Sequence, residues 1–299
     1  MSREFITADV FTDTPFGGNQ LALFLDGESL SDEDMQRITW EFNFSETAFL
    51  LPPDDPAHTR RLRIFTPGGE VPFAGHPTVG AAAILAAEGL VPLEHGRSRV
   101  IFEEGIGPVR VDIEVDGNGS PWAQLWAAQA PELGPPAPPL QALADVATLP
   151  PEDLGRHELL PGAVSCGLPY VIVPVRDRAA LARARLNLPA WERVLAEFWA
   201  PAIYLYAADE SNELHARMFA PGLDVMEDPA TGSAATALGA YLAMHGRVTD
   251  GTSTWVIHQG AEMGRPSRIE VAADVEHGQV TAIRVGGHSV LVTRGRFLV

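Results

Sequence analysis

Alternating apolar and polar positions open the chain and predict a half-buried strand over residues 5–10, because successive side chains of a strand point to opposite faces. Gly17 and Gly18 then turn the chain toward a second apolar run at 20–24. Ser31 with Asp34 three residues later is typical of a helix start. The pattern therefore predicts strands at 5–10, 20–24 and 47–51 and a helix from Ser31 to about Phe42. The same order recurs as a strand at 170–175, a helix around 191–198 and a strand at 202–207.

Two stretches of the chain, residues 63–89 and 217–246, repeat one another. Five residues of the first stretch recur 154 positions later, namely Arg63, Phe65, Pro67, Gly68 and Val71, which match Arg217, Phe219, Pro221, Gly222 and Val225. At a spacing of 152 positions, His76, Pro77 and Gly80 match Asp228, Pro229 and Gly232. Each half is thus expected to run strand, turn, titratable residue, proline, helix.

Proline is tolerated at the first helical residue because its missing N–H has no partner there in any case. Pro77 and Pro229 therefore predict that His76 and Asp228 are the N-caps of two helices. Both predicted helices are rich in Ala and Gly, which lets neighbouring backbone approach closely, and we interpret them as central core helices. Gly89 and Gly246 are placed to end them.

The rest of the chain is rich in predicted strands. Residues 131–162 carry dense proline and predict a linker with one short helix at 139–148. Further strands are expected at 254–258, 268–273, 279–285 and 289–297. Strands outnumber helices, and regular strand-helix-strand units are few, so the fold class is α+β with two similar lobes. We place the lobes at 1–126 and 127–299, with a C-terminal strand at 288–299 that can pair back onto the first lobe.

Composition removes several classes of function. The chain has 299 residues, enough for two domains, and a formal net charge of −18, which opposes binding to nucleic acid or to an anionic membrane. No apolar run reaches the roughly 18 residues of a membrane span, and the N-terminus lacks a signal-peptide core, so we expect a soluble cytoplasmic protein. Cys166 is the only cysteine, and the nine histidines show no paired spacing. No metal site is therefore predicted.

Three ionisable side chains are candidates for acid-base chemistry. The start of a helix attracts carboxylates, so His76 and Asp228 at two such starts could hold a small anion between them. Asp is also a common N-cap for stability alone, and His76 could be a solvent-facing turn residue. Glu46 falls on an apolar face of its predicted strand, where burial would make it a better base. Alternatively, the strand begins one residue later and Glu46 lies in solvent.

Two weaker candidates are polar. Asn19 follows the glycine turn and could offer its amide to a ligand or serve only the turn itself. Ser233 lies five residues after Asp228, where its hydroxyl and N–H could meet a carboxylate, although no GxSxG motif supports a nucleophile. The carboxylate pairs Asp54–Asp55 and Glu103–Glu104 are interpreted as solvated loop charge without a role.

At these residues the chain resembles the PhzF family, the phenazine-biosynthesis-like proteins that share the diaminopimelate epimerase fold. The resemblance covers nearly the whole length and is carried by DVFTDTPFGGNQLALF, SETAF, FTPGGEVPFAGHPTVGAA and EDPATGSAA. It implies two lobes, each a mostly antiparallel sheet curled around a central helix, with the active site in the cleft between them and often a homodimer. It also implies that Glu46 moves a proton with His76 and Asp228 as partners, while Gly75, Gly232 and Ser233 hold the substrate carboxylate.

The resemblance and the residues together favour a cofactor-independent isomerase that moves a proton between carbons of a small carboxylate. Neither a GxGxxG motif nor a P-loop is present, so no nucleotide cofactor is predicted. The epimerases of this fold use two cysteines at the helix starts, and His76 and Asp228 exclude that thiol chemistry here. Two alternatives stay open: a non-catalytic carboxylate-binding protein, and a hydrolase that uses Glu46 and Asp228 as a carboxylate pair.

Overall fold

The structure is a computed structural model that describes residues 2–115, 120–155, 159–209, 213–247 and 250–298. The chain divides into two compact units of mixed helices and strands, so the predicted α+β class is confirmed. Unit 1 comprises residues 1–128 and 284–299, and unit 2 comprises residues 129–283. The predicted boundary at 126/127 thus differs by two residues, and the last sixteen residues belong to unit 1. No helix in the described ranges is both long and apolar enough to cross a bilayer.

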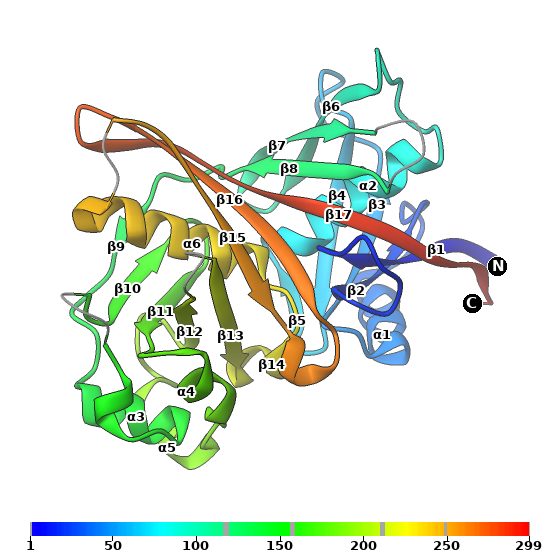
Figure 1. Ribbon diagram of the computed structural model, residues 1–299. Coiled ribbons are helices and arrows are strands. Elements are labelled where there is room, and N and C mark those ends of the chain that lie inside the picture. The colour runs from blue at the N-terminus through cyan, green and yellow to red at the C-terminus, as the bar shows by residue number, and fades with distance from the viewer. Residues whose placement is uncertain (1, 116–119, 156–158, 210–212, 248–249, 299) are drawn as a thin grey trace. The chain divides into compact units, whose positions relative to one another are not determined.

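The elements of unit 1 follow one another as β1 (Ser2–Val10), β2 (Asn19–Phe24), α1 (Asp32–Phe42), β3 (Glu46–Leu51), β4 (Arg60–Thr66), β5 (Gly69–Val71), α2 (Gly75–Ala87), β6 (Arg97–Glu104), β7 (Gly107–Glu114) and β8 (Trp122–Trp126) (Figure 1). Strand β17 (Gln279–Leu298) begins in unit 2 and ends in unit 1.

Unit 2 contains β9 (Glu132–Leu133), α3 (Leu140–Ala147), β10 (Gly162–Ser165), β11 (Pro169–Pro174), α4 (Arg178–Arg183), α5 (Leu188–Val194), β12 (Ala202–Ala208), β13 (Leu214–Ala220), β14 (Val225–Asp228), α6 (Gly232–Leu242), β15 (Gly251–Gln259) and β16 (Ser267–Glu276). Short 3₁₀ turns lie at Pro151–Asp153, Pro221–Leu223 and Ala261–Met263, and a π turn at Ala243–Arg247 continues α6.

The strands of unit 1 close into a ring around α2. Antiparallel and parallel pairings run β1–β2–β3–β4–β6–β7–β8, and β17 pairs with both β8 and β1. Every residue of α2 from Gly75 to Ala86 is buried, as expected for an apolar helix surrounded by sheet. Gly80 shows how tight the packing is, because a Cβ there would lie 2.6 Å from Val10 Cγ2.

Unit 2 repeats the same pairing order around α6. Its strands β11 and β12 are parallel, β12 and β13 antiparallel, β13 and β15 parallel, and β15 and β16 antiparallel. The register repeats as well: Phe49 lies opposite Arg63 in unit 1, and Leu205 lies opposite Arg217 in unit 2. The repeat in the sequence is therefore a repeat of strand pairing.

The apolar and capping patterns of the sequence predicted the positions of most helices and strands correctly. The capping residue Ser31 accepts a hydrogen bond from the Asp34 N–H, which confirms the predicted start of α1. Strands β2, β3, β11, β12, β15 and β16 lie where runs of apolar residues predicted them.

Two predictions about the remaining segments were wrong. The predicted strands at 279–285 and 289–297 are one strand, because β17 passes from one pairing partner to the next without a break. The segment 131–162 lies in the second unit, as the lobe bounds predicted, and α3 confirms the short helix expected at 139–148, but the segment is no linker: β9 pairs with β10, and α3 buries Leu143 and Val146 in the apolar core. Residues 156–158 of that segment lie outside the described ranges.

Candidate active site

Helix α2 begins at Gly75, and Ala74 is its N-cap without a side-chain hydrogen bond. The predicted N-cap role of His76 is therefore wrong, because His76 is the second residue of the helix. Pro77 consequently sits third, where its missing N–H is still harmless. The imidazole thus projects from the first turn of a fully buried helix.

His76 is only 3% exposed and is held by two hydrogen-bonding groups. Its Nε2 lies 3.2 Å from the carbonyl oxygen of Gln20, and its Nδ1 lies 3.2 Å from the Asn19 side-chain nitrogen. A carbonyl can only accept, so Nε2 carries the proton and Nδ1 presents its lone pair. Burial lowers the pKa of His76 to about 3, so the imidazole is neutral near pH 7.

Glu46 is the first residue of β3, opposite Leu21 of β2, and its side chain is 16% exposed. The alternative in which the strand begins one residue later does not hold. One carboxyl oxygen lies 3.4 Å from His76 Nδ1. A bare imidazole nitrogen and a carboxylate oxygen repel each other, so this approach is favourable when a proton lies between them. The Glu46 carboxyl and the His76 imidazole thus lie close enough for a proton to pass between them.

Asn19 reaches this pair because of the turn before it. Gly18 has φ +57°, and a Cβ there would lie 2.2 Å from the Val10 carbonyl oxygen, so only glycine fits. Asn19 is 1% exposed, and its amide nitrogen and the Glu46 carboxyl approach the same Nδ1 lone pair. Asn19 is therefore a partner of His76 and more than a turn residue.

In unit 2, Asp228 ends β14 opposite Met218, and α6 begins four residues later at Gly232 with Thr231 as N-cap. The predicted N-cap role of Asp228 is wrong as well, because strand pairing retains Asp228. One Asp228 carboxylate oxygen accepts a 2.5 Å hydrogen bond from the Thr231 hydroxyl. The carboxylate is buried and so depends on such donors.

A glutamine braces this start of α6. The Gln259 side-chain N–H₂ donates to the Asp228 carbonyl at 2.7 Å and to Thr231 Oγ1 at 3.0 Å. Its side-chain oxygen accepts from the Tyr204 hydroxyl at 2.9 Å and from the Thr231 N–H at 3.3 Å. Burial, together with the nearby charge of Asp228, raises the pKa of Tyr204 well above its usual value, so the hydroxyl keeps its proton. The segment from Asp228 to Thr231 is thereby fixed from one side.

Gly232 and Ser233 are the first two residues of α6, as Gly75 and His76 are of α2. The structural counterpart of His76 is therefore Ser233, and not Asp228 as the sequence match predicted. The Ser233 hydroxyl lies 2.6 Å from the Tyr170 hydroxyl, and both residues are buried. This end of α6 offers unpaired N–H groups and a hydroxyl pair, which suits a carboxylate.

The carboxylate of Glu46 has no counterpart in unit 2. Ala202 begins β12 opposite Tyr170 just as Glu46 begins β3 opposite Leu21. The two units therefore differ in their side chains at the same place in the fold, with a carboxyl group beside an imidazole in unit 1 and a pair of hydroxyls at the helix start in unit 2.

Other reactive groups do not join either set. Cys166 follows β10 and is buried, and burial raises the pKa of its thiol to about 12, so it stays protonated. Within the described ranges, no three His, Cys, Asp or Glu side chains are grouped as ligands of a metal ion.

The structure brings Asn19, Glu46, Gly75 and His76 together in unit 1, and Asp228, Gly232 and Ser233 together in unit 2. Sequence pattern missed their supporting residues, which are Tyr170, Tyr204, Thr231 and Gln259. Three of these four come from strands or turns far from the EDPATGSAA motif, so only tertiary contacts identify them.

Known proteins resemble this chain over its whole length. Residues 8–295 match the family described as phenazine biosynthesis-like protein, PhzC-PhzF. An uncharacterized isomerase of Mesorhizobium japonicum is 41% identical over 100% of this chain and 99% of the relative. The trans-2,3-dihydro-3-hydroxyanthranilate isomerase of Pseudomonas chlororaphis is 33% identical over 98% of each chain.

A solved structure agrees with these relatives. The PhzF-family phenazine biosynthesis protein of Bacillus anthracis superimposes with a TM-score of 0.88 at 30% identity and covers 100% of both chains. The chain therefore belongs to the phenazine biosynthesis-like PhzC-PhzF family and is an isomerase of the PhzF type.

Proposed function

We propose that this isomerase works without a cofactor and moves a proton from one carbon to another of a small unsaturated carboxylate. The observation that carries the proposal is the Glu46–His76 pair, in which a carboxyl oxygen of the partly exposed Glu46 lies 3.4 Å from Nδ1 of the buried His76. Such a pair can take up and release a proton beside a bound substrate. The Pseudomonas chlororaphis relative, an isomerase of a cyclic amino carboxylate, supports a substrate of this class.

Glu46 transfers the proton in this proposal, and His76 controls where it rests. When Glu46 carries the proton, it can donate to His76 Nδ1, and when Glu46 has given the proton to substrate, the Asn19 amide can donate to the same lone pair. His76 stays neutral throughout because its pKa is lowered by burial. Asn19 thus acts on His76, and its predicted direct contact with substrate is no longer needed.

The substrate carboxylate binds at the helix starts. Gly232 and Ser233 present N–H groups at the start of α6, and Tyr170 fixes the Ser233 hydroxyl at 2.6 Å. Gly75 offers the corresponding N–H groups at the start of α2. Asp228, held by Thr231 and Gln259, adds a fixed negative charge that steadies positive charge on the substrate.

The proposal requires that the two units act as lobes of a diaminopimelate epimerase-like fold, with substrate in a cleft between them. The repeated strand order around α2 and α6 supports it, because pseudo-symmetric lobes present equivalent helix ends. We further propose a cytoplasmic homodimer, as for the family that the sequence resembles.

Turnover in heavy water tests this function. Small unsaturated carboxylates, with trans-2,3-dihydro-3-hydroxyanthranilate among them, are incubated with the enzyme in D₂O and followed by NMR. We expect one compound to isomerise, with deuterium at the new C–H position to the extent that the Glu46 carboxyl exchanges with solvent before it delivers the proton. Turnover at an unchanged rate in Glu46→Gln would contradict a transfer by Glu46. Incorporation of oxygen from H₂¹⁸O would instead support a hydrolase, and binding without turnover would support a carboxylate-binding protein.

A further inference from the structure

Glu104 is a buried acid at the end of β6, where sequence pattern predicted solvated loop charge. The residue is only 9% exposed. One of its carboxyl oxygens lies 2.7 Å from the Thr78 hydroxyl on α2, and the other has no partner among the described residues. The interpretation of the Glu103–Glu104 pair as solvated charge is therefore wrong for Glu104. Its side chain instead contacts the helix that carries His76.

The hydrogen bonds of the Thr78 hydroxyl indicate the protonation state of Glu104. The Thr78 hydroxyl lies 2.7 Å from the Ala74 carbonyl oxygen and 2.7 Å from the Glu104 carboxyl. A hydroxyl has one proton to donate, and a carbonyl can only accept it. Both contacts are satisfied when Thr78 donates to Ala74 and Glu104 donates to Thr78. Glu104 is then a neutral carboxylic acid, and burial agrees with this by raising its pKa to about 8.

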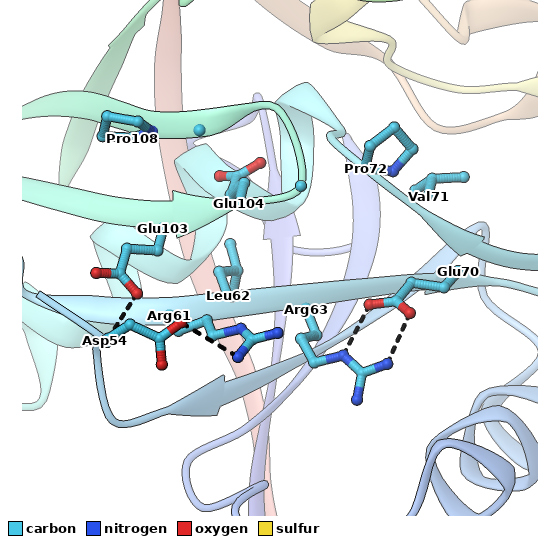
Figure 2. Close-up of a pocket in the computed structure, with 12 residues that line it drawn as sticks. Asp54, Arg61, Leu62, Arg63, Glu70, Val71, Pro72, Glu103, Glu104 and Pro108 are labelled. Carbon is cyan, nitrogen blue, oxygen red and sulfur yellow. Dashed lines mark hydrogen bonds and ion pairs between the residues drawn. The ribbon is translucent and has the colours of Figure 1, made fainter.

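The charged groups around Glu104 are occupied with one another. Glu104 borders a cavity of about 550 Å³, and the charged residues around this cavity come from β4, β5, β6 and the loop before β4 (Figure 2). Arg63 pairs with Glu70 and Asp32, Arg61 with Asp54, and Glu103 with His58 and the N–H groups of Asp54 and Asp55. His76, the titratable residue of α2 nearest Thr78 in the chain, is neutral. Figure 2 shows no dashed line from Glu104 to any of the residues drawn. Among the described residues, these cations are thus paired elsewhere and do not offset a negative charge on Glu104.

In unit 2, an amide side chain occupies the position that is equivalent to Glu104. In the strand register, Arg61 of β4 lies opposite Glu103 of β6, and its counterpart His215 of β13 lies opposite His258 of β15. The residues that follow, Glu104 and Gln259, are therefore equivalent. Both end their strands. Gln259 braces the start of α6 through Asp228 and Thr231, and its N–H₂ donates whatever the pH. Glu104 can donate in the corresponding place only while it keeps its proton.

We propose that Glu104 is a positioning residue for His76. Its acid proton braces Thr78, Thr78 braces the Ala74 carbonyl, and Ala74 is the N-cap from which Gly75 and His76 follow. The backbone hydrogen bond to the Ala74 carbonyl is weak, since the Thr78 backbone nitrogen lies 3.4 Å from the carbonyl oxygen. The Thr78 hydroxyl forms the shorter hydrogen bond to this oxygen, at 2.7 Å. Loss of the proton leaves a buried unpaired charge and loosens the first turn of α2. The consequence for isomerisation rests on the proposed function, whereas the bracing itself does not.

The stability of the protein should depend on pH through Glu104. Its folded pKa of about 8 lies above its ordinary value of 4.5. The stabilising contribution is therefore fully present below about pH 4.5, falls as the pH rises, and is lost above about pH 8. Glutamine cannot ionise and donates to Thr78 as the acid does. We expect Glu104→Gln to match the wild type in Tm at the acid end and to exceed it increasingly toward pH 8.

NMR of ¹⁵N-histidine-labelled protein tests the link to His76 without any substrate. In the wild type, the His76 ring nitrogens should shift with a midpoint near pH 8, far from the pKa of His76 itself. In Glu104→Gln this transition should be absent, with the ring shifts otherwise as in the wild type below the midpoint. Glu103→Gln removes the same charge from the neighbouring residue and should keep the transition.

Two results would overturn the proposal. One is an infrared spectrum of wild-type protein at pH 7 in which no protonated carboxyl band is lost on Glu104→Gln substitution, a readout that does not depend on a change in fold. The other is a His76 titration near pH 8 that is flat in the wild type or unchanged in Glu104→Gln. Either result would leave the isomerase proposal standing, because turnover in D₂O tests Glu46 separately.

Discussion

Replacing Glu46 by glutamine is expected to lower turnover by about 10²- to 10⁴-fold while substrate affinity changes only a few-fold. Glutamine keeps the size of the side chain and places an amide where a Glu46 carboxyl oxygen lies 3.4 Å from His76 Nδ1 in the wild type. It cannot take a proton from carbon or give one back. The loss should therefore appear in kcat, with KM little changed. Steady-state kinetics on the compound that turns over in D₂O provide the measurement.

The matched control for this prediction is Glu41→Gln, which removes the same charge from an exposed position of α1. We expect its kcat and KM to equal those of the wild type within a factor of two or so. A Glu46→Gln enzyme that keeps its full kcat would assign the proton transfer to another group. A loss confined to KM would make Glu46 a binding residue and would favour the carboxylate-binding alternative.

Replacing Arg217 by methionine is expected to lower the free energy of unfolding by about 3–5 kcal/mol. The guanidinium is 3% exposed and forms two 2.8 Å hydrogen bonds with the Glu227 carboxylate. A third donor reaches the Ala184 carbonyl at 2.6 Å. Methionine fills much of the space but leaves the carboxylate and the carbonyl without this donor. Urea denaturation at neutral pH gives the free energy.

Arg63 supplies the control from the other unit, since it occupies the same position of the repeat. It pairs with Glu70 and Asp32, but these carboxylates are 43% and 81% exposed and can return to water. Arg63→Met should therefore cost only about 1 kcal/mol. An equal decrease in the free energy of unfolding for Arg217→Met and Arg63→Met would show that burial of the ion pair does not determine how much it stabilises the protein.

Local sequence pattern predicted the parts of the fold that depend on neighbouring residues. Ser31 caps α1 because the capping contact lies within one turn, and β3 covers the apolar run predicted as a strand at 47–51, with Glu46 added at its start. The repeat was visible because both copies keep their arginine, proline and glycine at the β4 and β13 turns. The duplicated helices followed from the same repeat, together with their all-round apolar character.

The remaining features depend on contacts that no local pattern contains. Asp-Pro reads as a helix start, yet Asp228 stays in a strand because it pairs with Met218 ten residues earlier. The last strand was predicted as two, at 279–285 and 289–297, but β8 and then β1 pair with β17 through the residues between them. Glu104 follows another glutamate and reads as solvated, although Thr78, 26 residues away, draws it into the core.

The division of chemistry between the two units was also hidden. Sequence matching paired His76 with Asp228, whereas the helix starts pair His76 with Ser233. The hairpin from β13 to β14 is longer than the one from β4 to β5 and shifts the alignment, and only the positions of the strands and helices reveal it. The same comparison places Ala202 at the position of the repeat that Glu46 occupies in unit 1, so the carboxylate of Glu46 is not repeated there.

A crystal structure of the Glu46→Gln protein with its bound carboxylate substrate tests the central claim most directly. We predict the substrate carboxylate on the N–H groups of Gly232 and Ser233, with the reacting carbon within about 3–3.5 Å of the side chain of residue 46. One molecule would then touch both the acid-base pair of unit 1 and the helix start of unit 2. Substrate bound wholly within one unit, out of reach of residue 46, would contradict the account.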